Sequence, residues 1–119
     1  MRHRAVSIIA TEVAILEAST ELKRAGQDEV DGYLLAKRIR ELRQARRLTA
    51  YGRLYNALTR LERLGYLASR WEEPHDTAAQ GQPRRRLYRL TLVGEGALSA
   101  VRAADRGSLT NRPAAAGLQ

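Results

Sequence analysis

Three polar residues in the middle of the chain recur at the spacing of one helical turn. Arg53, Asn56 and Arg60 are three and four residues apart, so on a helix they share one face. A guanidinium can bond bidentately to the edge of guanine, and an amide can do the same to adenine. The spacing therefore indicates a helix face that reads base edges. The alternatives are a solvated surface and, for Arg60, an ion pair with a carboxylate on a neighbouring helix.

A second group of residues is suited to phosphate contact. Tyr51 lies near the predicted start of the same helix, where anions are favoured, and the hydroxyl of Tyr55 can reach a phosphate while its ring packs on the domain. The alternative for Tyr55 is a half-buried core position. Arg84, Arg85 and Arg86 are consecutive, so in a strand the first and third share one face and Arg85 takes the other. We expect at least one of them to bind phosphate; the alternative is a charged edge strand that resists aggregation.

The residue inventory excludes most catalytic chemistry. The chain has no cysteine and only two histidines, which leaves no thiolate nucleophile, disulfide or thiolate zinc site. His75 lies near Glu72, Glu73 and Asp76, but a polar loop with Pro and Gly is better explained as solvated than as a metal site. We therefore expect no enzyme activity, no catalytic residues, no metal and no cofactor.

The positive charge is concentrated in one part of the chain. The 119 residues carry 21 Lys and Arg against 13 Asp and Glu, a net charge of +8. Residues 37–63 contain most of the excess, whereas residues 1–36 are net acidic. A uniformly basic background would be more even, so the pattern favours a charged face that binds a polyanion such as nucleic acid.

Targeting signals are absent from the sequence pattern. No apolar run approaches the roughly 18 residues of a membrane span. Ser7, Thr11, Glu12 and Glu17 interrupt the N-terminal apolar residues, which is unlike a secretory signal. We expect a cytoplasmic protein without a membrane partner.

Apolar periodicity and capping residues predict the elements that position these groups. Ile9, Val13 and Leu16 form the apolar stripe of the first helix. Trp71 ends the first strand of the hairpin and is expected to pack in the core or on the hairpin. Gly26 and Gly65 are suited to end the first and third helices. The first predicted helix covers residues 7–25, the second begins at an Asp31 cap and ends in the basic stretch 43–47, and the third covers residues 49–64. Two strands at 66–71 and 85–90 follow, joined by a loop at 72–83, and a last helix covers residues 92–106.

The order of these elements is that of a winged helix-turn-helix, mainly α with a small β-hairpin. We expect residues 1–106 to form one DNA-binding domain that includes N-terminal and C-terminal dimerisation helices. Residues 107–119 show little apolar periodicity and are expected to be a disordered tail.

Three sequence blocks resemble the PadR-like transcriptional regulators. Residues 52–71 read GRLYNALTRLERLGYLASRW, residues 81–94 read GQPRRRLYRLTLVG, and residues 31–33 read DGY. The blocks keep the family's order and together span residues 31–94. The chain departs from the family pattern at Arg53, Asn56 and Gln82, where the family often has Thr, Pro and Arg.

The resemblance implies a homodimeric repressor that binds double-stranded DNA at a promoter inverted repeat. Its third helix would enter the major groove, and its last helix would form the dimer. Some relatives bind flat aromatic inducers through an aromatic residue of the last helix. Residues 92–106 contain no aromatic residue, so a small-molecule inducer is compatible with the family but unsupported here. Two alternatives stay open: a winged-helix adaptor that binds a protein partner, and an architectural DNA-binding accessory factor.

Overall fold

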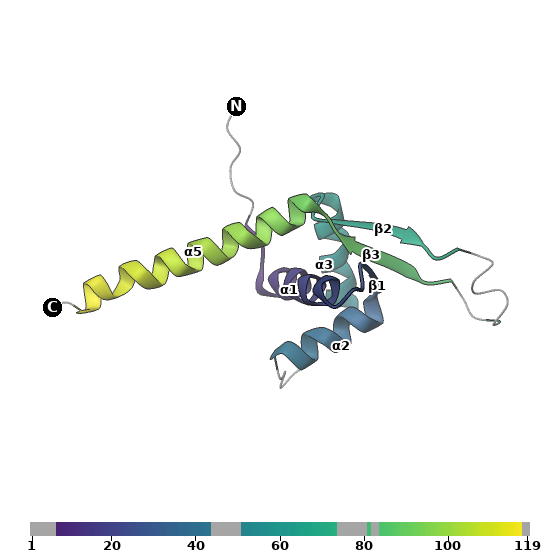
Figure 1. Cartoon of the computed structure of the whole chain (residues 1–119), viewed down its shortest axis with the longest axis horizontal. Helices are drawn as coiled ribbons and strands as arrows, with labels where there is room; N and C mark the ends of the chain where they lie inside the picture. Colours follow the sequence, from purple (N-terminus) through teal and green to yellow (C-terminus); the bar gives the residue numbers. More distant parts are fainter. Residues whose placement is uncertain (1–6, 44–50, 74–80, 82–83, 118–119) are drawn as a thin grey trace, which may run out of the picture.

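The computed structural model describes residues 7–43, 51–73, 81 and 84–117. In chain order the elements are α1 (Ala10–Arg24), β1 (Glu29–Asp31), α2 (Gly32–Arg43), α3 (Tyr51–Arg63), β2 (Leu67–Trp71), β3 (Arg86–Leu90) and α5 (Leu92–Gly117). The helices α1, α2 and α3 lie together, while the β2–β3 hairpin and α5 extend from them in opposite directions (Figure 1). This is the predicted winged helix-turn-helix order with one additional strand.

Glycines end α1 and α3, as predicted. Gly26 has a φ of +92°, and the next amide, that of Gln27, donates to the carbonyl of Leu22 at 2.8 Å. Gly65 has a φ of +83° and ends α3 in the same way, because the Tyr66 amide donates to the carbonyl of Leu61 at 2.9 Å. A residue with a Cβ is strained at such φ values, so these two glycines fix where the chain leaves each helix.

Side-chain caps start the two helices that flank the sheet. The Asp31 carboxylate accepts a hydrogen bond from the Leu34 amide at 2.9 Å and so caps α2. The Thr91 hydroxyl oxygen accepts from the Gly94 amide at 3.0 Å and caps α5. The Asp31 cap was predicted from residue type and position.

The core is formed mainly by leucine and isoleucine side chains from the helices. Among the described residues, the largest fully buried apolar side chains are those of Ile15, Leu16, Leu35, Leu54, Leu58, Leu61 and Leu67. The stripe predicted for α1 was wrong at its first position, because Ile9 precedes the helix and is exposed. The face that α1 buries is instead centred on Ile15 and Ala18.

The sheet has three antiparallel strands in the order β1–β3–β2. The sequence predicted only the hairpin formed by β2 and β3. β1 has three residues, of which only Val30 is buried, and it pairs with β3 rather than with a neighbour in sequence. Such a strand has no local signal, because its stability comes from a distant partner.

The last helix is longer than predicted. α5 continues beyond Arg106 to Gly117 and covers most of the segment expected to be a disordered tail. The end was predicted from the loss of apolar periodicity, but that periodicity reports which face of a helix is buried and does not fix where the helix ends. None of the described helices is long and apolar enough to cross a membrane.

Candidate nucleic-acid interface

The helix α3 separates apolar and polar side chains onto opposite faces. Leu54, Leu58 and Leu61 are buried, whereas Arg53 and Asn56 are exposed. The buried leucines hold the helix against the domain and leave its outer face accessible, as a helix that enters a DNA groove requires. The structure thus leaves Arg53 and Asn56 on the accessible face that their spacing predicted.

The exposed face of α3 continues further than the residues singled out from the sequence. Thr59 and Arg63 are also exposed. Arg63 follows Asn56 by seven residues, which is two helical turns, so the same periodicity could have identified it. Arg63 therefore extends the cationic face to the end of the helix.

Arg60 is held by the protein itself. Its guanidinium lies 2.6 Å from a carboxylate oxygen of Glu12 in α1 and donates to the Ser7 carbonyl at 3.1 Å. The same Glu12 oxygen accepts from the Ile9 amide at 3.0 Å. Only 3% of the Glu12 side chain is exposed, so Arg60 neutralises a buried charge. The structure therefore places Arg60 in the inter-helix ion pair that the sequence left open as an alternative.

Tyr55 lies across the start of α2. It is 44% exposed, and a Cβ built on Gly32 would be 2.8 Å from its hydroxyl oxygen. Gly32 thus makes room for the tyrosine at the helix-turn-helix junction. Tyr51 begins α3, but its side chain lies outside the described residues.

Two wing arginines lie over one indole ring. The guanidinium carbons of Arg84 and Arg86 are 5.9 and 5.1 Å from the centroid of Trp71. Trp71 is 52% exposed, so the prediction of a core position was wrong, while packing on the hairpin was correct. Arg86 also lies 3.7 Å from Glu62 of α3. The indole therefore orients two cations on one side of the wing, the side that strand alternation predicted they would share.

Arg85 points to different partners. Its guanidinium lies 2.5 Å from Glu72 and 3.0 Å from Asp31, the residue that caps α2. These bonds raise the pKa of Arg85, and the hydrogen bond from Arg85 holds the pKa of Glu72 below its ordinary value. Two carboxylates around one guanidinium leave no excess positive charge there. Arg85 therefore ties the wing to the start of α2.

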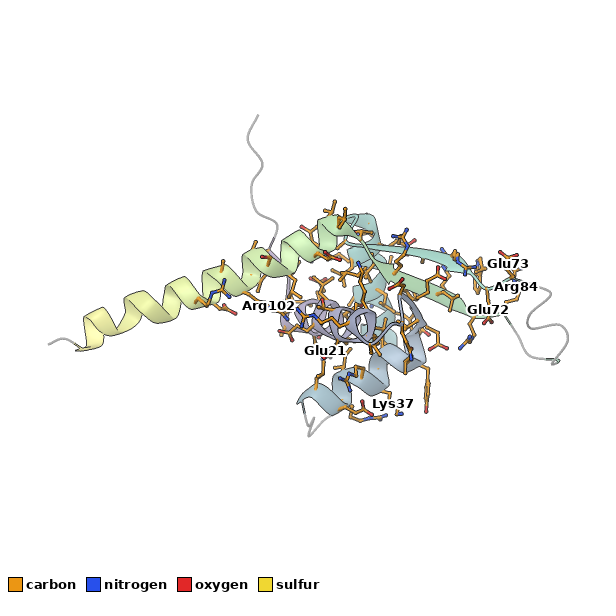
Figure 2. The ribbon with its side chains drawn as sticks, viewed as in Figure 1. Glu21, Lys37, Glu72, Glu73, Arg84 and Arg102 are labelled. Atoms are coloured by element: carbon orange, nitrogen blue, oxygen red, sulfur yellow. The ribbon has the colours of Figure 1, made fainter. Side chains whose placement is uncertain are left out.

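A groove of about 320 Å³ joins these parts. It is lined by Asp31, Gly32, Tyr33, Tyr55, Trp71, Arg84, Arg85 and Arg86. Tyr33 and Trp71 are both more than half exposed, so aromatic surface and guanidinium groups border the same hollow. Figure 2 shows Arg84 at the far end of the hairpin, close to Glu72 and Glu73. Tyrosine hydroxyls and arginines are groups that bind phosphate oxygens, so the groove is suited to a nucleic-acid backbone.

The part of the chain that the structure describes contains no group of three His, Asp or Glu side chains placed to hold a metal. His75 and Asp76, weighed above as metal ligands, lie outside the described residues.

Comparisons with known proteins match this architecture. Residues 22–100 match the model of the Transcriptional regulator PadR-like family, which includes all of residues 31–94, where the resemblance was identified. No curated protein sequence matches the chain.

Several solved structures share the fold. A transcriptional regulator from Clostridium thermocellum is 24% identical, with 91% of this chain and 92% of that chain covered and a TM-score of 0.62. A PadR family transcription regulator from Clostridium difficile R20291 is 20% identical, with 90% and 98% covered and a TM-score of 0.65. The circadian clock associated protein Pex from Anabaena is 21% identical, with 87% and 84% covered and a TM-score of 0.52.

Proposed function

Because the chain belongs to the PadR-like family of transcriptional regulators, we propose that it is a homodimeric repressor that binds a promoter inverted repeat. The family is one of DNA-binding regulators rather than enzymes, and the proposal assigns no catalytic residue. The observation that carries it is the exposed face of α3, where Arg53 and Asn56 lie opposite a fully buried leucine face.

In this proposal the protein makes two kinds of contact with DNA, to base edges and to phosphates. Arg53 and Asn56 read base edges in the major groove, and Arg63 extends this face. Arg84 and Arg86, oriented by Trp71, bind phosphates and fix the register of the domain on the duplex. Tyr51 and Tyr55 add phosphate contacts at the start of α3 and at the edge of the groove.

The long last helix supports the dimeric part of the proposal. Its 26 residues span roughly 39 Å, yet Leu98 is the last buried side chain along its described part. Leu92 and Val93 are more than half exposed at its start. A second copy packed along α5 would cover this surface and place two copies of α3 on one face of a duplex. We regard residues 1–106 as one DNA-binding domain that acts in the cytoplasm.

A binding selection from random duplex DNA with the purified chain tests the proposal. A two-fold symmetric dimer should enrich an inverted repeat with half-site centres about one helical turn, roughly 34–36 Å, apart. Binding without enrichment would instead favour an architectural accessory factor. A folded chain that binds no duplex would favour the adaptor that contacts a protein partner. Repression itself is tested by transcription from a promoter that carries the enriched site.

A further inference from the structure

We propose that the groove between the start of α2 and the wing binds one unstacked nucleotide, with the base against Tyr33 and the phosphate on Arg84. The groove has a volume of about 320 Å³. That volume is at the lower end of the roughly 300–1,000 Å³ range of small-molecule sites, which suits one nucleotide rather than a longer segment. The inference goes beyond the proposed function, because the bases of a duplex stack on one another and leave no ring face for a protein side chain.

The groove offers aromatic surface that a phosphate alone would not cover. Tyr33 at the start of α2 and Trp71 at the end of β2 both line it, and both are more than half exposed. Arg84 and Arg86 border the same hollow. Exposed rings beside guanidinium groups are typical of sites for unpaired bases, because every base has a face that stacks and a phosphate that binds a cation. The residue types of the groove therefore match a whole nucleotide better than a bare phosphate.

Arg84 is the residue best placed to bind the phosphate. Its Nε donates to the Glu72 carbonyl at 3.0 Å, and its guanidinium carbon lies 5.9 Å from the centroid of Trp71. Within the described part of the chain, these contacts leave both terminal nitrogens of the guanidinium without an acceptor. The Glu72 carboxylate pairs with Arg85, and that of Glu73 lies 3.8 Å from Arg70. Two free N–H groups on one guanidinium match two oxygens of a phosphate.

The carboxylate that lines the groove is already engaged. It belongs to Asp31, whose two oxygens accept hydrogen bonds from the Leu34 amide at 2.9 Å and from the Arg85 guanidinium at 3.0 Å. Arg86 lies 3.7 Å from Glu62, so this cation is also partly compensated. An anion that enters the groove therefore meets Arg84 as its main partner.

The test uses the fluorescence of Trp71, because the chain contains one tryptophan and that residue lines the groove. The full chain is titrated with adenosine 5′-monophosphate, with ribose 5-phosphate and with adenosine, all at constant ionic strength. We expect a saturable change in emission with the nucleotide. Both fragments should bind about tenfold more weakly, since ribose 5-phosphate lacks the stacking face and adenosine lacks the charge-assisted hydrogen bonds.

Three variants separate the two halves of the site. Tyr33→Ala should weaken binding of the nucleotide about tenfold and leave that of ribose 5-phosphate unchanged, because it removes only stacking. Arg84→Gln should weaken binding of both phosphates about tenfold. Arg89→Gln is the matched control, since it removes an exposed arginine of β3 that does not line the groove. It should leave every affinity unchanged.

A tetranucleotide of deoxyadenosine distinguishes a free nucleotide from one in a single strand. Tighter binding of the tetranucleotide assigns the groove to a strand, and equal or weaker binding assigns it to a free nucleotide. The proposal is overturned if neither changes the emission of Trp71, or if the nucleotide and ribose 5-phosphate bind equally. It is also overturned if Tyr33→Ala keeps full affinity, or if Arg89→Gln weakens binding as much as Arg84→Gln. Duplex binding is measured separately, so these outcomes leave the proposed function untouched.

Discussion

Arg60 of α3 and Glu12 of α1 form an ion pair 2.6 Å long in which the carboxylate is buried and the guanidinium is about one-third exposed. The pair joins the proposed reading helix to the first helix, and its hydrogen bonds reach the backbone at Ser7 and Ile9. Removing one partner of a buried ion pair leaves the other partner uncompensated and is strongly destabilising. The contact therefore fixes where α3 lies relative to α1.

Arg60→Met should lower the free energy of unfolding by about 3 kcal/mol, because it leaves the Glu12 carboxylate buried without its counter-ion. Urea unfolding followed by circular dichroism measures the change. Arg63→Met, at an exposed position on the same helix, should change stability by no more than about 0.5 kcal/mol. The double variant Glu12→Gln with Arg60→Met should recover part of the loss. Equal effects of the two single arginine variants would contradict this role.

Arg53→Ala should weaken binding to a selected operator by roughly 10- to 100-fold, which corresponds to about 1–3 kcal/mol for one bidentate base contact. Binding to unrelated duplex should change far less, because base contacts contribute little there. Fluorescence anisotropy with both duplexes at one salt concentration measures the ratio. Arg89→Ala removes a cation outside α3 and the groove and serves as the control. An equal loss on both duplexes would show that Arg53 binds phosphate instead.

Arg84 and Arg85 are adjacent but should behave differently. Arg84 lies over the exposed Trp71, whereas Arg85 is enclosed by Glu72 and Asp31. Arg84→Ala should therefore reduce the slope of log affinity against log salt by about 0.9, the value for one neutralised phosphate. Arg85→Ala should change that slope by less than half as much, because its main effect is to remove the ion pairs that join the wing to Asp31 and Glu72. Salt titrations of duplex binding compare the two, and a larger change for Arg85→Ala would reverse the assignment.

The local parts of the fold could be predicted because each has a local cause. Asp31 caps α2 and Gly26 and Gly65 end their helices, since capping depends on residue type at one position. The leucine periodicity of α3 specifies its buried face and leaves Arg53 and Asn56 outside. These elements were sufficient to identify the winged helix-turn-helix.

The long-range contacts could not be predicted from spacing. Strand alternation separates Arg85 from its neighbours, but nothing local indicates that Asp31, 54 residues earlier, is its partner. The same limit applies to β1, whose hydrogen bonds come from β3. Trp71 was expected either in the core or on the hairpin, and it lies exposed on the hairpin beneath Arg84 and Arg86. The site residues thus had predictable faces but unpredictable partners.

The Glu29–Arg70 pair should make the stability of the sheet depend on pH. The two side chains form two 2.7 Å hydrogen bonds that link the outer strands β1 and β2 across β3. The bond from Arg70 lowers the pKa of Glu29 below its ordinary 4.5. The folded chain therefore binds this proton less tightly than the unfolded chain, so the stabilisation is complete above pH 4.5 and is lost as the pH falls below it.

Urea unfolding of the parent and of Glu29→Gln over that pH range isolates the effect. Both groups are partly exposed, so we expect a difference of about 0.5 kcal/mol at neutral pH that shrinks as the carboxylate is protonated. Added salt should reduce the difference. Parallel stability curves for the two proteins at every pH would show that the pair contributes nothing.

Gly94 and Gly96 occupy the first turns of α5 in very different surroundings. A Cβ on Gly94 would lie 2.2 Å from the Tyr66 carbonyl oxygen and 2.9 Å from a methyl group of Leu90, whereas a Cβ on Gly96 would meet nothing within 4 Å. The helix thus packs against the turn after α3 only because residue 94 has no side chain. Gly94→Ala should destabilise the fold by about 1–3 kcal/mol, because a backbone carbonyl must move to accept the methyl group. Gly96→Ala should stabilise it by up to about 1 kcal/mol through helix propensity alone. The two substitutions add the same methyl group two residues apart, so urea unfolding of both separates the close contact from the general effect of alanine, and a stabilising Gly94→Ala would show that α5 is not packed on this turn.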